Sequence, residues 1–410
     1  MTIQEKIIFQ NTHWKEGKFT TFTFKRHLFG KVWADIDTRL IALITGPRRT
    51  GKSVLLKQIV NELISAKKIT PTQILFFEFS PTQATETIWE VYNFFAKEVC
   101  DPRQAVYIFF DEIQFIRNYE VTIKEIYDNA TNSPKIFLTG SLSLSYKRRM
   151  EESLSGRFFS YKFYPLNFAE YLELSKPESF TLFQNVRVET DRFKREHLLG
   201  QLNADFRKFL KHGRLPEMVS FTPDQSRNYL YTIISQSLNQ DAFSYFTIEK
   251  PQIINALFEY IRLNSGGLIS IYALAGELSV SSQTVASYLS VLETMGLTYL
   301  IYNSIHPLIR LNSAKKAYVS SMHFLCETKL DLTAATGFAV ESYILERLLE
   351  KGESVTFFRH REKEVDFLLP KKKNAYEVKY TSQPRKTGFV PKGYQLEIIS
   401  LDKNMPACLF

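Results

Sequence analysis

A glycine-rich loop constrains the fold more than any other feature of this sequence. It reads GPRRTGKS at residues 46–53, after an apolar run that predicts a strand and before a segment with helical periodicity. Two glycines let the loop curl, so that its backbone N–H groups point inward, toward a phosphate. The pattern in this context is typical of a nucleotide phosphate-binding loop. We therefore expect the following residues to line a nucleotide: Gly46, Pro47, Arg48, Arg49, Thr50, Gly51, Lys52, Ser53 and Val54.

Two side chains of this loop carry distinct chemistry. Lys52 is long enough to reach the β and γ phosphates, and the Ser53 hydroxyl is a ligand suited to Mg²⁺. The N-terminus of the following helix adds a favourable dipole for an anion. ATP and Mg²⁺ are therefore the expected cofactors.

A second motif, VYIFFDEIQ at residues 106–114, places two carboxylates at the end of an apolar strand. Asp111 is expected to hold Mg²⁺, and Glu112 to orient and deprotonate the attacking water, so both count as catalytic candidates with Lys52. A third strand end, LTGSLS at residues 138–143, offers Thr139 and Ser141 near the γ-phosphate. A hydroxyl-rich turn that caps the next helix explains these two residues equally well.

Alternation of short apolar runs with longer helical segments predicts an α/β fold with a parallel sheet between about residues 38 and 166. Nearly continuous hydrophobic runs are expected of strands covered on both faces. The candidate strands are RLIALIT (39–45), ILFFEF (74–79), AVYIFFD (105–111), KIFLTG (135–140) and RFFSYKFYPL (157–166).

Length and composition set the class of protein. A chain of 410 residues exceeds a single core, which stops growing near roughly 250–300 residues, so two or three domains are expected. No apolar run approaches the roughly 20 residues needed to cross a bilayer, which favours a cytoplasmic protein without a membrane partner. The scattered Cys100, Cys326 and Cys408 predict neither disulfides nor a metal site. A net charge of +9 favours a polyanionic partner, although dispersed surface lysines also explain it.

Two regions follow the predicted sheet. Residues 167–265 are helix-rich and read as a helical lid or connector, whereas 266–303 predict a winged helix-turn-helix. Ser281 or Ser282 would cap its second helix and place Gln283 and Ser287 on the face that meets bases in DNA-binding versions. That helix carries no Arg or Lys, so a packing role is the stronger interpretation.

The last segment predicts an α+β module. A helix at GFAVESYILERLLEKG (337–352) precedes four strand-like runs, SVTFFRH (354–360), EVDFLLP (364–370), AYEVKY (375–380) and QLEIISL (395–401). One helix that leads into a run of strands is typical of an α+β fold.

The order of these motifs resembles that of bacterial and archaeal ATPases with an AAA-like N-terminal domain and a C-terminal module similar to PD-(D/E)XK restriction endonucleases. The resemblance covers nearly the whole chain. Its markers are ITGPRRTGKSVLLKQ, FFDEIQ, FLTGSLSLS, ESLSGRFFSYKFYPLNFAEYL, GRLPEMV (213–219), the stretch at 266–303, and EVDFLLP followed by AYEVKY. The chain departs from the family where it reads YVSSMHFL (318–325) and in the short, proline-containing stretch after Lys379.

The resemblance implies a domain order and ATPase activity. The expected domains are an N-terminal extension (1–37), an AAA-like P-loop domain (38–166), the helical lid or connector (167–265), the winged helix (266–313) and a PD-(D/E)XK nuclease-like domain (314–410). Arg148, Arg149 and Arg157 are candidates for a residue that stabilises the transition state of phosphoryl transfer.

The same resemblance implies a nuclease-like centre. Asp366 and Glu377 would bind a metal ion, Lys379 would activate water, and Glu341 would complete the cluster. Alternate positions on a strand send Glu377 and Lys379 to one face. Cross-strand ion pairing also explains these charges, so cleavage stays open.

Three functions fit the sequence. The first is an ATP-driven enzyme that acts on nucleic acid, DNA rather than RNA. The second is a nucleotide-gated switch or scaffold whose C-terminal domain is an inactive binding module. The third is a transcription regulator that binds ATP as a ligand. Homo-oligomerisation is compatible with each.

Overall fold

The chain forms two compact units, residues 1–163 and 164–410. This computed structural model describes residues 1–81, 86–141, 153–246, 248–304, 315–321, 332–361, 363–379 and 390–400. Arg148, Arg149, Cys326, Cys408 and most of the two stretches that depart from the family pattern lie outside these ranges. Within them, no helix is both long and apolar enough to span a membrane.

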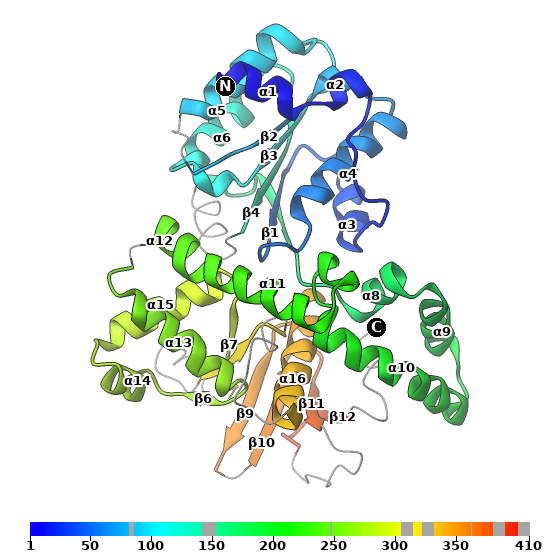
Figure 1. Cartoon of the computed structure of the whole chain (residues 1–410), viewed down its shortest axis with the longest axis vertical. Helices are drawn as coiled ribbons and strands as arrows, with labels where there is room; N and C mark the ends of the chain where they lie inside the picture. The colour runs from blue at the N-terminus through cyan, green and yellow to red at the C-terminus, as the bar shows by residue number, and fades with distance from the viewer. Residues whose placement is uncertain are drawn as a thin grey trace. The chain divides into compact units, whose positions relative to one another are not determined.

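A five-stranded parallel sheet organises the N-terminal unit (Figure 1). Its order is β2-β3-β4-β1-β5, so β4 lies between the strand before the glycine-rich loop and the strand that carries Asp111. The predicted α/β fold and its five strands are confirmed. The strands are β1 (Ile41–Thr45), β2 (Ile74–Glu78), β3 (Tyr107–Asp111), β4 (Lys135–Gly140) and β5 (Phe158–Lys162).

Helices cover both faces of this sheet. Figure 1 shows α3 (Leu28–Ala34) and α4 (Lys52–Ser65) on one side, and α5 (Glu86–Phe94) and α6 (Tyr119–Asn129) on the other. Alternate residues of the central strands meet α4, among them Ile44, Phe76, Phe109 and Phe137, and these are buried with Leu56, Ile59 and Leu63 of that helix. Burial on both faces explains why the strand sequences are continuously apolar.

The N-terminal extension belongs to this unit. Its helices α1 (Ile3–Gln10) and α2 (His13–Glu16) pack beside β2, the edge strand of the sheet. The Asn11 side chain pairs with the backbone of Phe76, donating to its carbonyl at 2.8 Å and accepting from its N–H at 2.7 Å. His13 Nε2 donates to the Ile74 carbonyl at 3.0 Å. These side chains satisfy backbone groups that an edge strand would otherwise leave unpaired.

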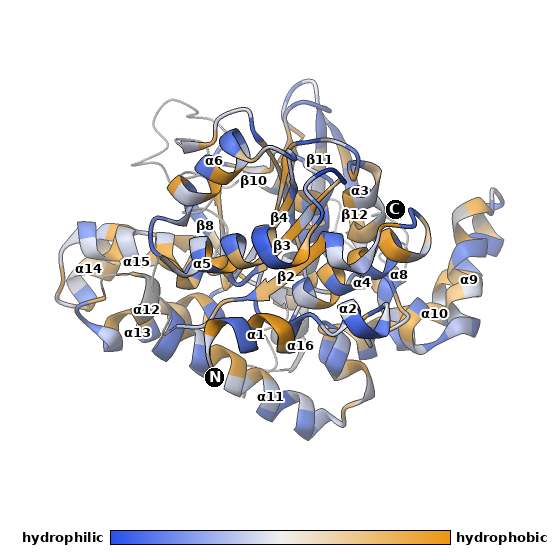
Figure 2. Ribbon diagram, turned by 90° about the horizontal axis from the view of Figure 1, so that it is seen from above, coloured by the Kyte–Doolittle hydropathy of each residue, from blue (hydrophilic) through white to orange (hydrophobic). Residues whose placement is uncertain are grey.

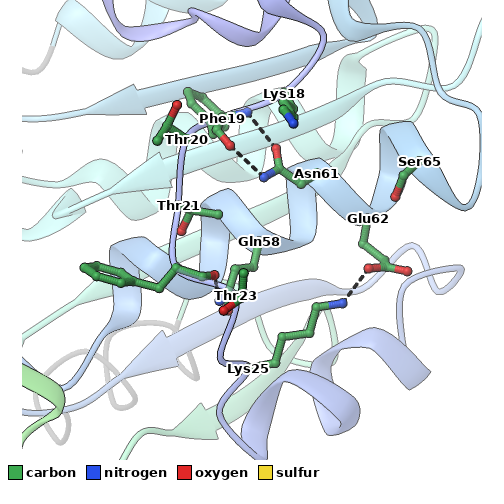
Figure 3. Close-up of a pocket in the computed structure, with 11 residues that line it drawn as sticks. Lys18, Phe19, Thr20, Thr21, Thr23, Lys25, Gln58, Asn61, Glu62 and Ser65 are labelled. Carbon is green, nitrogen blue, oxygen red and sulfur yellow. Dashed lines mark hydrogen bonds and ion pairs between the residues drawn. The ribbon is translucent and has the colours of Figure 1, made fainter. Parts of the chain in front are cut away.

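Residues 18–25 form a strap across α4, shown in Figure 3, where they line a pocket of about 350 Å³. Asn61 of α4 pairs with both backbone groups of Phe19, at 2.7 and 2.9 Å. Gln58 donates to the Phe22 and Phe24 carbonyls at 2.8 Å. The helix that follows the glycine-rich loop is therefore fixed from its outer side by the extension.

The C-terminal unit begins with helices that pack around aromatic rings. These are α8 (Phe168–Ser175), α9 (Pro177–Val188), α10 (Arg192–His212), α11 (Pro223–Gln236) and α12 (Ala242–Tyr245). Phe168 and Phe209 pack together at 5.4 Å between ring centroids, and Phe209 meets Tyr343 at 5.4 Å. Figure 2 shows hydrophobic and hydrophilic segments alternating along α10, as expected of a helix with one buried face.

A buried charge pair joins these helices to the last part of the chain. Arg214 and Glu346 pair with side-chain exposures of 2% each, and the Arg214 guanidinium also donates to the Leu166 carbonyl. Glu346 accepts from the Ser320 hydroxyl at 2.8 Å and from the Ser321 N–H at 2.9 Å. Each charge thus has several partners, although the Arg214 Nε–H donates to none of them among the described residues.

Two small sheets complete the unit. Helices α13 (Pro251–Leu263), α14 (Ile271–Glu277) and α15 (Ser282–Thr294) accompany an antiparallel sheet of β6 (Leu268–Ile269), β8 (Lys315–Val319) and β7 (Thr298–Tyr302). Helix α16 (Leu332–Glu350) precedes a mixed sheet in the order β12-β11-β10-β9. Its strands are β9 (Thr356–His360), β10 (Lys363–Leu369), β11 (Asn374–Lys379) and β12 (Gln395–Ser400). The names winged helix and nuclease-like domain stay predictions.

Burial of His13 predicts an acid-sensitive N-terminal unit. Burial lowers the pKa of His13 from 6.5 to about 4, against the opposing hydrogen bond to Ile74. The unfolded chain therefore binds the proton more tightly than the folded one, and stability falls as the pH drops from about 6.5 to 4. Each pKa unit corresponds to about 1.4 kcal/mol, so this residue accounts for a loss of at most about 3 kcal/mol.

Urea unfolding followed by tryptophan fluorescence measures this effect, because Trp14, Trp33 and Trp89 all lie in the N-terminal unit. In His13→Gln the amide can still donate to Ile74, but no proton is taken up. We expect its unfolding free energy to depend less on pH between 6.5 and 4. Parallel pH profiles for the two proteins would contradict the assignment.

Candidate functional site

The glycine-rich loop leads from β1 into α4, with helix α4 beginning at Lys52. Gly51 has φ +103° and Arg49 has φ +63°, both in the left-handed region that lets the loop reverse. The Thr50 hydroxyl donates to the Pro47 carbonyl at 2.9 Å and holds the curl. The predicted strand–loop–helix arrangement is therefore present, and the backbone N–H groups that begin α4 are available to an anion.

Gly46 is required by space rather than by backbone angle. A Cβ at this position would lie 2.2 Å from the Phe163 carbonyl oxygen, just after β5. Phe163 is fixed there, since its N–H donates to the Thr45 carbonyl at 2.6 Å. The loop thus starts in direct contact with the neighbouring chain segment.

Lys52 is held inside the loop. Its Nζ donates to the Gly46 and Pro47 carbonyls, each at 2.9 Å, and the residue is 4% exposed. The lysine is therefore already oriented toward the space inside the loop.

Asp111 lies at the carboxyl end of β3, fully buried. Because β4 lies between β1 and β3, Thr139 at the end of β4 reaches this carboxylate and donates to Oδ1. Burial raises the pKa of Asp111 to about 6, the Glu112 charge adds to this, and the Ser53 and Thr139 hydroxyls oppose it. Asp111 and Ser53 are thus neighbours.

The fit of a Mg²⁺ ion can be judged from the oxygens on the chain. Oδ2 of Asp111 is buried and accepts no hydrogen bond from the residues that the structure describes, which is a costly state for a carboxylate unless a cation completes it. Mg²⁺ in nucleotide sites takes one or two protein oxygens, with phosphates and waters as its other ligands. Asp111 and Ser53 fit that need. Among the described residues, no group of three or more His, Cys, Asp or Glu could hold a metal without other ligands.

Glu112 adopts a backbone conformation with φ +54°, which is unusual for a residue with a side chain. Its N–H donates to the Thr139 hydroxyl at 3.1 Å. Gln114 donates its amide to the Glu112 carboxylate and to the Ser141 hydroxyl, the latter at 3.2 Å. Thr139 and Ser141 therefore both contact the acidic motif, and Gln114 holds the proposed base in place.

Sequence reasoning missed two residues of this site. Gln114 stands inside the quoted motif FFDEIQ, but no chemical role marked it. Arg26 comes from the N-terminal extension, with its guanidinium donating to the Thr50 carbonyl at 2.8 Å and lying 4.6 Å from the Phe163 ring centroid. No motif surrounds Arg26, so only the fold could reveal it. Arg157, one of the arginines considered for stabilising the transition state, forms an ion pair with Asp128, with 3.0 Å between its Nε and Oδ1 of Asp128.

The four residues of the nuclease-like centre converge. The pairing of β10 with β11 ends at Phe367 and Tyr376, and Asp366 and Glu377 are the next residues on the two strands. The Val378 N–H donates to Asp366 Oδ2 at 2.9 Å. The Lys379 ammonium nitrogen Nζ lies 2.5 Å from Oε1 of Glu377. Glu377 and Lys379 therefore share one face, in agreement with the i, i+2 argument.

Glu341 of α16 completes this group. Burial and then the Asp366 carboxylate raise the pKa of Glu341, which reaches about 8 although Lys316 and Lys379 oppose the rise. Sequence reasoning missed Lys316, which lies on β8 and contacts Glu364 at 2.5 Å and Asp366 at 3.5 Å. The centre thus contains two lysines rather than one.

Contact at Gly46 predicts the effect of adding one methyl group. Gly46→Ala must displace either the loop or the Phe163 backbone, at a cost of roughly 1–3 kcal/mol, which corresponds to roughly a 5- to 150-fold loss of ATP affinity. Gly30→Ala is the matched control, because nothing lies within 4 Å of the Cβ that this substitution would add to α3. Titration with a fluorescent ATP analogue measures both. Equal affinities would contradict the proposed loop geometry.

Two regions of the chain match known families. Residues 38–172 match a family described as an AAA domain, and residues 203–332 match a domain of unknown function. A protein of Haemophilus influenzae described as uncharacterized is 24% identical over 348 residues, which cover 82% of this chain and 80% of that protein. An uncharacterized protein of Methanocaldococcus jannaschii is 27% identical over 65% of this chain and 57% of its own length.

Among solved structures, the Holliday junction branch migration motor RuvB of Thermotoga maritima matches at 15% identity with a TM-score of 0.33. That match covers 67% of this chain and 89% of the RuvB chain. Hsp104 of Saccharomyces cerevisiae in complex with ADP matches at 14% identity with a TM-score of 0.36, over 72% of this chain and 42% of its own. The sheet and the family match together make the N-terminal unit similar to the P-loop domains of AAA ATPases.

Proposed function

We propose that the N-terminal unit binds ATP with Mg²⁺ and hydrolyses it. The observation that carries this proposal is the buried Asp111, whose Oδ2 accepts no hydrogen bond beside the helix start that carries Lys52 and Ser53. A phosphate on the α4 N-terminus would meet the Lys52 ammonium, and Asp111 and Ser53 would hold the ion. Bound Mg²⁺ would neutralise charge on the β and γ phosphates.

The chemistry follows from the position of Glu112. Its carboxylate accepts a proton from a water that attacks the γ-phosphorus, while the bond between that phosphorus and the oxygen of ADP breaks. Gln114 fixes the carboxylate through its amide, and its second contact, to Ser141, ties this arrangement to β4. The products are ADP and inorganic phosphate.

Two substitutions separate binding from hydrolysis. Lys52→Ala is expected to abolish ATP binding, since the ammonium that meets the phosphates is gone. Glu112→Gln is expected to keep ATP binding and to lower turnover by roughly 10²–10⁴-fold, because only the base is lost. Phosphate release and analogue binding measure the two effects. Glu125→Gln on the exposed side of α6 is the control and should match wild type. Full turnover in Glu112→Gln would exclude this residue as the base.

We further propose that the C-terminal unit binds nucleic acid, DNA rather than RNA. Exposed basic residues of the mixed sheet and its turns support this: Arg359, Arg361, Lys371, Lys372 and Lys373. Its helices and antiparallel sheet at residues 251–319 are compatible with a winged helix. On α15 the exposed Gln283 and Ser287 are uncharged, so contacts to the phosphate backbone rather than base readout would provide the affinity.

Salt dependence tests this second proposal. Duplex DNA binding should weaken linearly with the logarithm of salt concentration, and Arg361→Ala with Lys371→Ala should reduce that slope by about two. Lys97→Ala, an exposed lysine of the N-terminal unit, is the control. Duplex RNA of the same length tests the preference. ATP-dependent assembly without DNA binding would favour the nucleotide-gated switch instead.

A further inference from the structure

The acidic cluster of the C-terminal unit has a buried cation of its own. Lys316 is 3% exposed, and its Nζ lies 2.5 Å from Glu364 and 3.5 Å from Asp366. The ammonium also lies 5.6 Å from the centroid of the Phe357 ring. The ammonium is therefore held beside two carboxylates, away from solvent.

The expected metal ligands are already satisfied by the chain. Asp366 Oδ1 accepts from Lys316, and Oδ2 accepts from the Val378 N–H at 2.9 Å. Glu377 is paired with Lys379 at 2.5 Å. Asp111 differs from Asp366 in this respect, because its Oδ2 is buried and accepts no hydrogen bond. Asp111 thus leaves a carboxylate oxygen open to a cation, whereas Asp366 does not.

Electrostatics adds to this difference. A divalent ion between Asp366 and Glu377 would stand beside the ammonium groups of Lys316 and Lys379, and unlike an exposed lysine, Lys316 has no water into which it could swing. Repulsion between like charges is strong where solvent is excluded. The residues present do not fit a divalent metal, in contrast to what the resemblance to PD-(D/E)XK nucleases implies.

We propose that Lys316 takes the place of the divalent cation in this centre, so that the C-terminal unit neither binds Mg²⁺ or Mn²⁺ there nor cleaves nucleic acid with their help. Removal of Lys316 creates a metal site that the natural chain lacks. This inference is independent of ATP hydrolysis at Lys52 and of DNA binding by exposed basic residues.

Mn²⁺ binding to the nucleotide-free full chain tests the proposal, with free Mn²⁺ followed by electron paramagnetic resonance. All proteins carry Asp111→Asn, which removes the carboxylate of the ATP site. The chain with Lys316 intact is expected to take up no Mn²⁺ at micromolar concentration. Lys316→Met keeps the aliphatic stem and is expected to gain one Mn²⁺ per chain, and adding Asp366→Asn is expected to abolish that gain. Lys208→Met, at an exposed lysine of α10, is the control and gains none.

Circular dichroism checks that the Lys316→Met protein folds. A second comparison does not depend on the folding of that variant, because it uses only chains with Lys316 intact. Asp366→Asn alone should leave Mn²⁺ binding unchanged in the chain with Lys316 intact. The proposal would be overturned if Asp366→Asn lowered Mn²⁺ uptake by one equivalent per chain. It would also be overturned if Lys316→Met folded but bound no additional Mn²⁺. Metal-dependent DNA cleavage lost in both Asp366→Asn and Lys379→Ala, but kept in Lys52→Ala, would overturn it as well.

Discussion

The insertion of β4 between β1 and β3 determines the geometry of the nucleotide site. Parallel pairing of β4 with both neighbours brings Thr139 against Asp111, and the loop after β1 then opens on the same edge of the sheet. Without this strand order, Lys52 and Asp111 would follow adjacent strands and leave no room for a hydroxyl between them. Ligand sites at the carboxyl ends of parallel strands depend on such crossings.

Much of the N-terminal fold could be predicted, because its strands are buried on both faces and its loops carry marked residues. The strand ends and the loop from Gly46 to Ser53 follow directly from that pattern. The packing of the extension could not be predicted in this way. Asn11, His13 and Arg26 act through hydrogen bonds to backbone groups far away in sequence, such as those of Phe76 and Thr50, and such bonds leave no periodicity.

In the C-terminal centre, too, some features could be predicted from the sequence and others could not. Glu377 and Lys379 share a face because strand residues alternate, and this follows from spacing alone. The approach of Glu341 to Asp366 came from family resemblance, and the structure agrees with it. Lys316 could not be anticipated, since AKKAYV reads as an ordinary strand 50 residues before Asp366. Its role depends on the three-stranded sheet meeting the mixed sheet, which is a tertiary property.

The buried Arg214–Glu346 pair has a mechanical consequence. Arg214 follows α10, Glu346 belongs to α16, and Ser320 and Ser321 come directly after β8. Pulling these segments apart would leave a charge without its partner in apolar surroundings, at a cost of roughly 3–5 kcal/mol. Such a cost is a large fraction of the stability of a domain. The helical segment, α16 and the end of β8 should therefore respond to force as one stiff body, and any hinge must lie outside this network.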